Sequence, residues 1–499
     1  MENRSYFEKA LYFLRDKAVK HKYPLITSII TGLLCYMFFF VNKLAQQDEL
    51  AAIFGKGMSL TGGRWGLELI STIFPDYSMP WIYGAISIIF IAASACVVIE
   101  SLQIENRILQ CVFSALFTAS PSVTGIFTQP YLSAANTLAI LLSVIAIKLF
   151  IKKNIRRWIA GIVLLAFSLS MYQGYISLSA SIAIVILIKD VLICKKETFE
   201  TIKYGIRLLL LLLASVALYA LITVLVILLF NVQLNTYGIS NYGILMRLRV
   251  AYTAFAGYFI KGYFSFVSST TSLVFHIICI VLTAVIFIRK CIERKSASAV
   301  ALSWLLLILL PLSINCMYLA SSVDVMSAIV FMSFNSIYLL MIVLIDNSSC
   351  KQIHMRGAVS LGLSLIIVCN IYFANKISLK MYLQTEELRS YYTTLMTNVV
   401  NSGEFKSGEP LCIIGTPKGT YMLDEIDSKN FIGLTAENVY DIYTKTNYIR
   451  YYLGYDFQDV SFDWMMALKY SPEFAEMPCY PEPGSIKNIS GTTVVKLSE

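Results

Sequence analysis

Long apolar runs recur along the chain between Tyr23 and Phe373. A hydrocarbon core of about 30 Å needs about 20 consecutive apolar residues in a helix, and each run has roughly this length. The pattern predicts an all-α polytopic membrane protein with about eleven transmembrane helices. The expected spans lie near residues 23-42, 80-99, 107-125, 131-150, 158-172, 174-188, 206-230, 270-288, 298-318, 325-345 and 357-374.

The fifth and sixth runs are short, and only the Tyr172-Gln173-Gly174 region separates them. They form either a tight helical hairpin or one merged element. We favour the hairpin, because polar and glycine residues between two apolar runs are typical of a turn.

After Phe373 the pattern becomes polar, which predicts a small α/β domain. Helical spacing continues over 378–400 and recurs at 436–453. The segment LCIIGTP is typical of a buried strand that ends in a turn, and SIKNISGTTVVKL of a hairpin turning at Ser490-Gly491. We therefore expect a transmembrane domain over 1–375 and an extracytoplasmic domain over 376–499.

Charge gives the expected orientation. Cytoplasmic flanks of a membrane protein retain Lys and Arg. With the N-terminus inside, the cytoplasmic segments hold 22 such residues and the outer loops six. The sequence thus predicts a multi-pass plasma-membrane protein with a cytoplasmic N-terminus, an uncleaved signal anchor as first span and an extracytoplasmic C-terminal domain. The net charge of +9 then reflects topology, and nucleic-acid binding is not expected.

Two expected outer loops are long, over 42–79 and 231–269, and long loops often carry function. In the first, GGRWGLELISTIFP predicts a surface helix with an apolar stripe ending at Pro75. The stripe comprises Leu67, Ile70, Ile73 and Phe74. In the second, aromatic residues alternate with cations, which is typical of an interfacial belt. These residues are Tyr252, Phe255, Tyr258, Phe259, Tyr263, Phe264 and Phe266, with Arg247, Arg249 and Lys261.

The expected outer face contains almost no histidine, so a proton acceptor working there must be a carboxylate. Asp48 and Glu49 follow the first span closely, and two adjacent acids would raise one pKa. The same pair is also compatible with ordinary solvated loop acids. The other acidic candidates in these loops are Glu68, Asp76 and Asp324.

Further polar residues have two readings each. Arg64 and Trp65 sit where glycines and a helix start could receive a phosphate, or they anchor the loop at the interface. Tyr172, Gln173 and Tyr175 could bind sugar hydroxyls, or they cap the hairpin. The GTPKGT stretch lacks the spacing of a phosphate loop. The eleven cysteines show no zinc-ligand spacing, and only Cys412 and Cys479 fall in the C-terminal domain, where they could pair.

These motifs together resemble the GtrII-type glucosyltransferases, which belong to the GT-C class of membrane enzymes. The resemblance rests on the acids after the first span, GRWG about fifteen residues later, QPYLSAANTLAI, MYQGYISLS and the ending MPCYPEPGSIKNISGTTVVKL. It covers nearly the whole chain. Many members carry an arginine near the start of the tenth span, where this chain has SSVDVMSAIVF. Phosphate binding would then fall to other cations.

The resemblance implies transfer of glucose, or a similar hexose, from a polyprenyl-phosphate donor to a surface glycan such as teichoic acid or O-antigen. One carboxylate and one or two cations suffice for inverting displacement, so a divalent metal is compatible but not required, and no cofactor is expected. Asp48 or Glu49 would be the base. The phosphate would be bound by Arg64, Arg247, Arg249 or Lys261, and the sugar or acceptor by Trp65, Gln129, Tyr172 and Gln173. A small flippase and a donor synthase are the implied partners.

Two other functions remain open on the sequence. A lipid-linked glycan polymerase or ligase would also place carboxylates and arginines outside, and a donor assay distinguishes it. A flippase should show paired charges within the membrane or repeat symmetry, and neither is found. A purely structural anchor would not require eleven spans.

Overall fold

The computed structural model describes residues 6–44, 46–51, 60–73, 78–235, 242–257, 270–320, 328–346, 353–417 and 442–498. The chain divides into two compact units. Unit 1 comprises Met1–Val41, Lys56–Pro75 and Met79–Asn375, and unit 2 comprises Asn42–Gly55, Asp76–Ser78 and Lys376–Glu499. Residues 42–55, which the sequence placed in the first outer loop of the membrane domain, thus belong to the same unit as the C-terminal residues.

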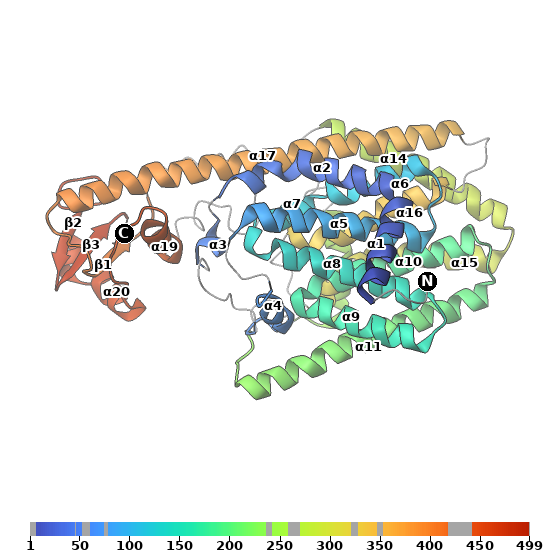
Figure 1. Ribbon diagram of the computed structural model, residues 1–499, viewed down its shortest axis with the longest axis horizontal. Coiled ribbons are helices and arrows are strands. Elements are labelled where there is room, and N and C mark those ends of the chain that lie inside the picture. Colours follow the sequence, from blue (N-terminus) through green and yellow to red (C-terminus); the bar gives the residue numbers. More distant parts are fainter. Residues whose placement is uncertain are drawn as a thin grey trace. The chain divides into compact units, whose positions relative to one another are not determined.

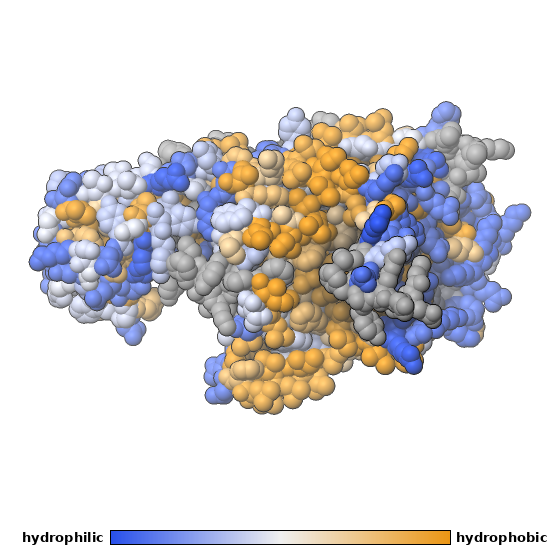
Figure 2. Space-filling model, in the orientation of Figure 1, coloured by the Kyte–Doolittle hydropathy of each residue, from blue (hydrophilic) through white to orange (hydrophobic). Residues whose placement is uncertain are grey.

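Unit 1 is helical (Figure 1). Its surface shows broad apolar patches, and hydrophilic residues gather on the right of the view (Figure 2). The elements are α1 (Tyr6–Lys20), α2 (Lys22–Val41), α4 (Trp65–Ile70), α5 (Pro80–Leu102), α6 (Arg107–Thr118), α7 (Pro121–Phe127), α8 (Pro130–Ile151), α9 (Ile155–Met171), η1 (Gln173–Tyr175), α10 (Ile176–Leu192), α11 (Thr198–Phe230), α12 (Ile244–Gly257), α14 (Thr270–Arg294), α15 (Ala297–Ile314), η3 (Cys316–Leu319), η4 (Ala328–Phe334) and α16 (Asn335–Asp346), followed by the first part of α17 (Ile353–Asn401).

The long apolar helices confirm a multi-pass membrane protein. Among the described residues, nine helices are long and apolar enough to cross a membrane, or ten if α6 and α7 form one span. These two helices meet at an angle of 43°, at Ser120-Pro121, where the Ser120 side chain caps α7. The remaining expected span is α9, which has only 17 residues. The expected third span is therefore broken, because a proline interrupts its hydrogen-bond ladder.

The expected fifth and sixth spans form two antiparallel helices, α9 and α10, joined by Tyr172 and η1. Lys153, just before α9, and Lys189, near the end of α10, line the same cavity. The two helices therefore start and finish at one end of the unit, and η1 lies at the opposite end. Tyr172 leaves the helical conformation, with φ of −154°, and this break separates the two helices.

Each of the two long loops contains a helix. In the first loop this helix is shorter than expected, and in the second loop no helix was expected. The predicted surface helix ends at Ile70 rather than at Pro75, and Ile73 is 68% exposed. Leu67 and Ile70 are buried where α4 packs on α9. The second loop contains α12, which carries Arg247, Arg249, Tyr252 and Phe255, whereas 258–269 lie outside the described residues.

Unit 2 is a small α/β unit built on the later part of α17. Strands β1 (Leu411–Ile414), β3 (Thr492–Lys496) and β2 (Ile486–Ile489) form a sheet in that order. β1 pairs with β3 in parallel, with Cys412 opposite Val494, and β2 pairs with β3 antiparallel. The expected hairpin turn is confirmed: Ser490 and Gly491 have φ of 49° and 80°, as a two-residue turn requires. The helices are α3 (Gln47–Ala51), α19 (Ile442–Tyr451), α20 (Phe462–Lys469) and α21 (Pro472–Glu476).

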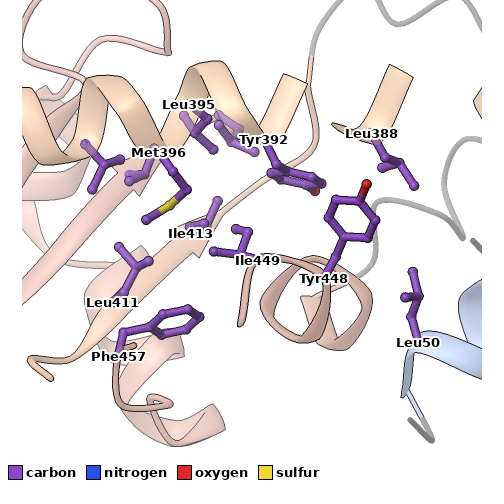
Figure 3. Packing of buried hydrophobic residues seen from close by; sticks show 13 residues of the cluster. Leu50, Leu388, Tyr392, Leu395, Met396, Leu411, Ile413, Tyr448, Ile449 and Phe457 are labelled. Carbon is purple, nitrogen blue, oxygen red and sulfur yellow. The ribbon is translucent and has the colours of Figure 1, made fainter. Parts of the chain in front are cut away.

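One hydrophobic core joins distant parts of unit 2. Leu388, Tyr392 and Met396 of α17 face Ile413 of β1 and Ile449 of α19, and Leu50 of α3 joins the same cluster (Figure 3). The predicted helix at 378–400 and strand at 411–414 are thus present, and the helix expected at 436–453 is described from Ile442 to Tyr451. Cys412 and Cys479 are free thiols.

Candidate active site

The glycines before Arg64 are bound to the hairpin tip. The Gln173 side-chain amide donates hydrogen bonds to the Gly62 carbonyl oxygen and the Tyr219 hydroxyl, both at 2.9 Å. The Tyr219 hydroxyl donates in turn to the Gly63 carbonyl oxygen at 3.1 Å. The loop, η1 and α11 are therefore held together by one hydrogen-bond network.

Trp65 and Gly66 fix the start of α4 on the same surface. The Trp65 indole N–H donates to the Thr223 hydroxyl at 3.2 Å, and its ring lies 6.0 Å from that of Phe167. A Cβ on Gly66 would lie 2.0 Å from the Ser170 hydroxyl oxygen, so only glycine allows this approach. The sequence GRWG is thus a packing motif that sets the position of the arginine between its glycines.

Arg64 lies at the centre of this arrangement. Its guanidinium carbon is 5.2 Å from the centroid of the Tyr172 ring, a cation–π distance. The Nε atom is buried, and no described residue accepts a hydrogen bond from it. Buried polar groups normally have a hydrogen-bond partner. An unpaired buried N–H group therefore suggests that a ligand supplies the acceptor.

Two buried tyrosine hydroxyls lie close by. The Tyr175 ring is 5.2 Å from that of Tyr172, and Tyr318 is close enough to Tyr172 to interact with it electrostatically. Both side chains are 1% exposed, and neither hydroxyl has a hydrogen-bond partner among the described residues. We call Arg64, Tyr172, Tyr175 and Tyr318 the Arg64 cluster. It combines a cation with uncommitted hydroxyl groups, which is suited to a phosphorylated sugar.

η3 is held against α10 beside this cluster. The Ser177 hydroxyl accepts a hydrogen bond from the Met317 backbone N–H at 3.3 Å and lies 3.4 Å from the Cys316 sulfur. Arg247 of α12 donates to the Leu319 carbonyl oxygen at 2.7 Å. Arg247 therefore supports the backbone next to Tyr318.

The other predicted ligand residues are placed differently. Arg249 is exposed on α12, and Lys261 lies outside the described residues. Gln129 precedes α8 and is 5% exposed, with its backbone N–H bonded to the Ile126 carbonyl oxygen at 3.2 Å. The structure thus gathers Arg64, Trp65, Tyr172 and Gln173, and it adds Tyr219, Thr223 and Tyr318, which the sequence did not single out. Tyr219 could have been noticed as a hydroxyl in the apolar run of α11.

The two candidate acids lie in unit 2, on α3. Glu49 is 2% exposed, and its Oε1 atom is 3.3 Å from the Lys43 amine. Lys43 also donates to the Ser78 carbonyl oxygen at 2.6 Å, and the Gln46 side chain accepts from the Glu49 backbone N–H at 3.0 Å. The Asp48 side chain is half-buried. Asp48 is therefore the more accessible of the two carboxylates.

Burial raises the pKa of Glu49 to about 7, although the neighbouring Lys43 ammonium opposes the shift. Tyr452 of unit 2 is close enough for the Glu49 charge to act on its hydroxyl. Of the other candidate acids, Glu68 is half-buried on α4, whereas Asp76 and Asp324 lie outside the described residues. Within the described ranges, no three His, Cys, Asp or Glu side chains are grouped to hold a metal ion.

The chain was compared with models of known protein families. The model of the family "Glucosyl transferase GtrII" matches residues 37–340. The chain belongs to the GtrII glucosyltransferase family. This match includes the acids of α3, the GRWG loop, the α9–α10 hairpin and η3, and it ends before the part of unit 2 that follows Lys376. No curated protein and no solved structure gives a match. This GtrII family member is therefore a multi-pass membrane glucosyltransferase.

Proposed function

We propose that this glucosyltransferase transfers glucose from a polyprenyl-phosphate donor to a cell-envelope glycan on the outer face of the plasma membrane. The observation that carries the proposal is the Arg64 cluster. A guanidinium with a buried, uncommitted N–H group suits an anionic oxygen, and the Tyr175 and Tyr318 hydroxyls can bind further oxygens.

An apolar cavity in unit 1 supports a donor with a prenyl chain. It has a volume of about 560 Å³ and lies among α12, α14, α15 and α16. Its lining is almost wholly apolar and includes Phe255, Phe287 and Pro311. Pro311 lies shortly before η3, which contributes Tyr318 to the Arg64 cluster. If the prenyl chain occupies this cavity, the phosphate of the donor lies at the end of the cavity nearest η3.

The proposed reaction is a single displacement with inversion. The acceptor hydroxyl oxygen forms a bond to the anomeric carbon, the bond from that carbon to the phosphate oxygen breaks, and the polyprenyl phosphate leaves as an anion. Arg64 stabilises the charge that develops on the phosphate. We assign the role of general base, which takes the proton from the acceptor hydroxyl, to Asp48, because its side chain is only half-buried whereas Glu49 is enclosed beside Lys43.

The test uses the full-length protein in nanodiscs with an envelope glycan as acceptor. The proposal expects transfer from polyprenyl-phosphate glucose with inverted anomeric configuration, and no transfer from a nucleotide sugar. Asp48→Asn should lower kcat about 10² to 10⁴-fold, as expected for the loss of a general base. Asp463→Asn, which removes an exposed acid from α20, is the matched control.

Transfer of a whole oligosaccharide from a lipid carrier would instead indicate a polymerase or ligase. Turnover by Asp48→Asn at the rate of the control variant would contradict the assignment of the base.

A further inference from the structure

A polar cavity lies at the end of unit 1 opposite to the Arg64 cluster. It has a volume of about 620 Å³ and is found where α5, α8 and α10 end and α11 begins. Pockets of about 300 to 1,000 Å³ hold small-molecule ligands, so this one has room for more than a single ion. Lys189 in the lining of this cavity follows Tyr175 of the Arg64 cluster by 14 residues of α10, which is roughly 20 Å at the rise of an α-helix.

The lining of this cavity is basic. Among the described residues, it contains five cations and two carboxylates. The cations are Lys153, Lys189, Lys196, Lys203 and Arg207, and the carboxylates are Asp190 and Glu200. We call it the Arg207 pocket.

Most of the positive charge in the Arg207 pocket is not neutralised. Lys196 pairs with Asp190 at 2.7 Å and Lys203 with Glu200 at 3.4 Å. Lys189 is 8% exposed and donates to the Leu102 carbonyl oxygen. No described carboxylate pairs with Lys153 or Arg207. The pocket therefore retains a net positive charge that favours an anionic ligand.

Two buried polar groups of the pocket, on Arg207 and Tyr204, lie close together. The Arg207 guanidinium carbon lies 4.7 Å from the Tyr204 ring centroid and 5.3 Å from that of Trp158. The Arg207 Nε and the Tyr204 hydroxyl are buried; the two side chains interact with each other, and no other described residue bonds to either atom. Phosphate oxygens accept charge-assisted bonds from both kinds of donor.

The wall beside the pocket is apolar and exposed. α9 and α11 pack against each other, and Arg207 lies on α11 between Ile206 and Leu210, which are 54% and 59% exposed. On α9, Ile159 and Val163 are also more than half exposed. Acyl chains can lie along this surface while a headgroup occupies the pocket.

We propose that the Arg207 pocket binds the phosphate headgroup of an anionic membrane phospholipid. Basic pockets between membrane helices on the cytoplasmic side are suited to such headgroups. The sequence predicts this Lys-rich end to be cytoplasmic, where anionic lipids are abundant. The site is separate from the Arg64 cluster, so its occupancy does not depend on which sugar donor the enzyme uses.

The test measures lipid binding to the delipidated full-length protein by native mass spectrometry. The added ligands are phosphatidylglycerol, phosphatidylcholine, a polyprenyl monophosphate and inorganic phosphate. The wild type should bind one phosphatidylglycerol more tightly than the other three. Lys153→Gln combined with Arg207→Gln should weaken that binding about tenfold or more, because each cation at a lipid headgroup contributes appreciably.

The matched control is Arg156→Gln combined with Arg157→Gln, which removes two exposed cations of the first turn of α9 without touching the pocket lining. It should weaken binding less than about twofold. If the Arg207 variant is unstable, Lys153→Gln alone, at an exposed position, is tested instead, and it too should weaken phosphatidylglycerol binding. Equal losses in both double variants, or equal binding of phosphatidylcholine, would refute a specific site. Stronger binding of the polyprenyl monophosphate or of inorganic phosphate would overturn the phospholipid assignment.

Discussion

Arg64 and Arg207 have the same local arrangement at opposite ends of unit 1. Each guanidinium lies over a tyrosine ring, at 5.2 Å from Tyr172 and 4.7 Å from Tyr204, and each has a buried Nε for which the described residues offer no partner beyond that tyrosine. Their neighbours differ. Arg64 lies near the buried hydroxyls of Tyr175 and Tyr318, whereas Arg207 shares an open pocket with lysines and two carboxylates.

This difference in surroundings suits the two different roles that we propose for the two arginines. A few uncommitted donors in a buried cluster favour one defined oxygen arrangement, as a transition state requires. Several lysines in a wide pocket attract any phosphate of suitable size, because an ammonium group acts as a point charge. Variants of the two sites should therefore affect different measurements.

Of the two arginines, Arg64 is expected to give the larger effect when it is replaced, as in Arg64→Gln. It removes the cation that stabilises the leaving phosphate, so kcat/KM for polyprenyl-phosphate glucose should fall about 10² to 10³-fold. The assay is turnover in nanodiscs, with Arg157→Gln, an exposed arginine of α9, as the control. The comparison fails if Arg207→Gln lowers kcat/KM as much as Arg64→Gln does.

A pH dependence of stability is expected from a buried carboxyl group. Glu49 is one source, because burial raises its pKa to about 7 from 4.5. Between these pH values the folded state binds more protons than the unfolded state, and the free energy of unfolding falls as pH rises. The loss is complete above pH 7 and amounts to about 3 kcal/mol.

Glu49→Gln should abolish this dependence. In thermal unfolding of the full-length protein, the variant should gain stability relative to the wild type between pH 5 and pH 8. Glu473→Gln, which replaces an exposed acid of the same unit, should show no such gain. An identical pH dependence in wild type and Glu49→Gln would mean that Glu49 does not titrate in this range.

Features that depend on neighbouring residues could be predicted from the sequence, whereas those that depend on contacts between distant residues could not. The apolar runs, the turn at Ser490-Gly491 and the strand at Leu411 depend on neighbouring residues, and they appear where expected. GRWG and the YQGY tip were each recognised locally, and the structure brings them together through Gln173 and Gly62. That Asp48 and Glu49 lie on α3 of unit 2 could not be predicted, because Leu50 packs with Tyr448 and Ile449, about 400 residues away.

A smaller effect is expected for the tyrosine hydroxyls of the Arg64 cluster. Tyr175→Phe and Tyr318→Phe each remove one buried hydroxyl and keep the ring, so packing is preserved. If each hydroxyl binds a donor oxygen, kcat/KM should fall about tenfold per variant, the value of one hydrogen bond of roughly 1.4 kcal/mol. Tyr338→Phe, at the hydroxyl that lies 2.7 Å from His276, is a matched control within the bundle. Unchanged kcat/KM in both variants would remove these hydroxyls from the site.

The smallest effect concerns the tie between the loop and the hairpin tip. Gln173→Ala removes two hydrogen bonds, to the Gly62 carbonyl oxygen and the Tyr219 hydroxyl. The expected loss of stability is about 1 kcal/mol, because exchange with water offsets most of each bond. Since the same bonds position the loop that carries Arg64, KM for the donor should rise a fewfold while the thermal transition moves little. A large fall in thermal stability without any change in KM would show that Gln173 only supports the fold, and that Arg64 is held in place by Trp65 and Gly66.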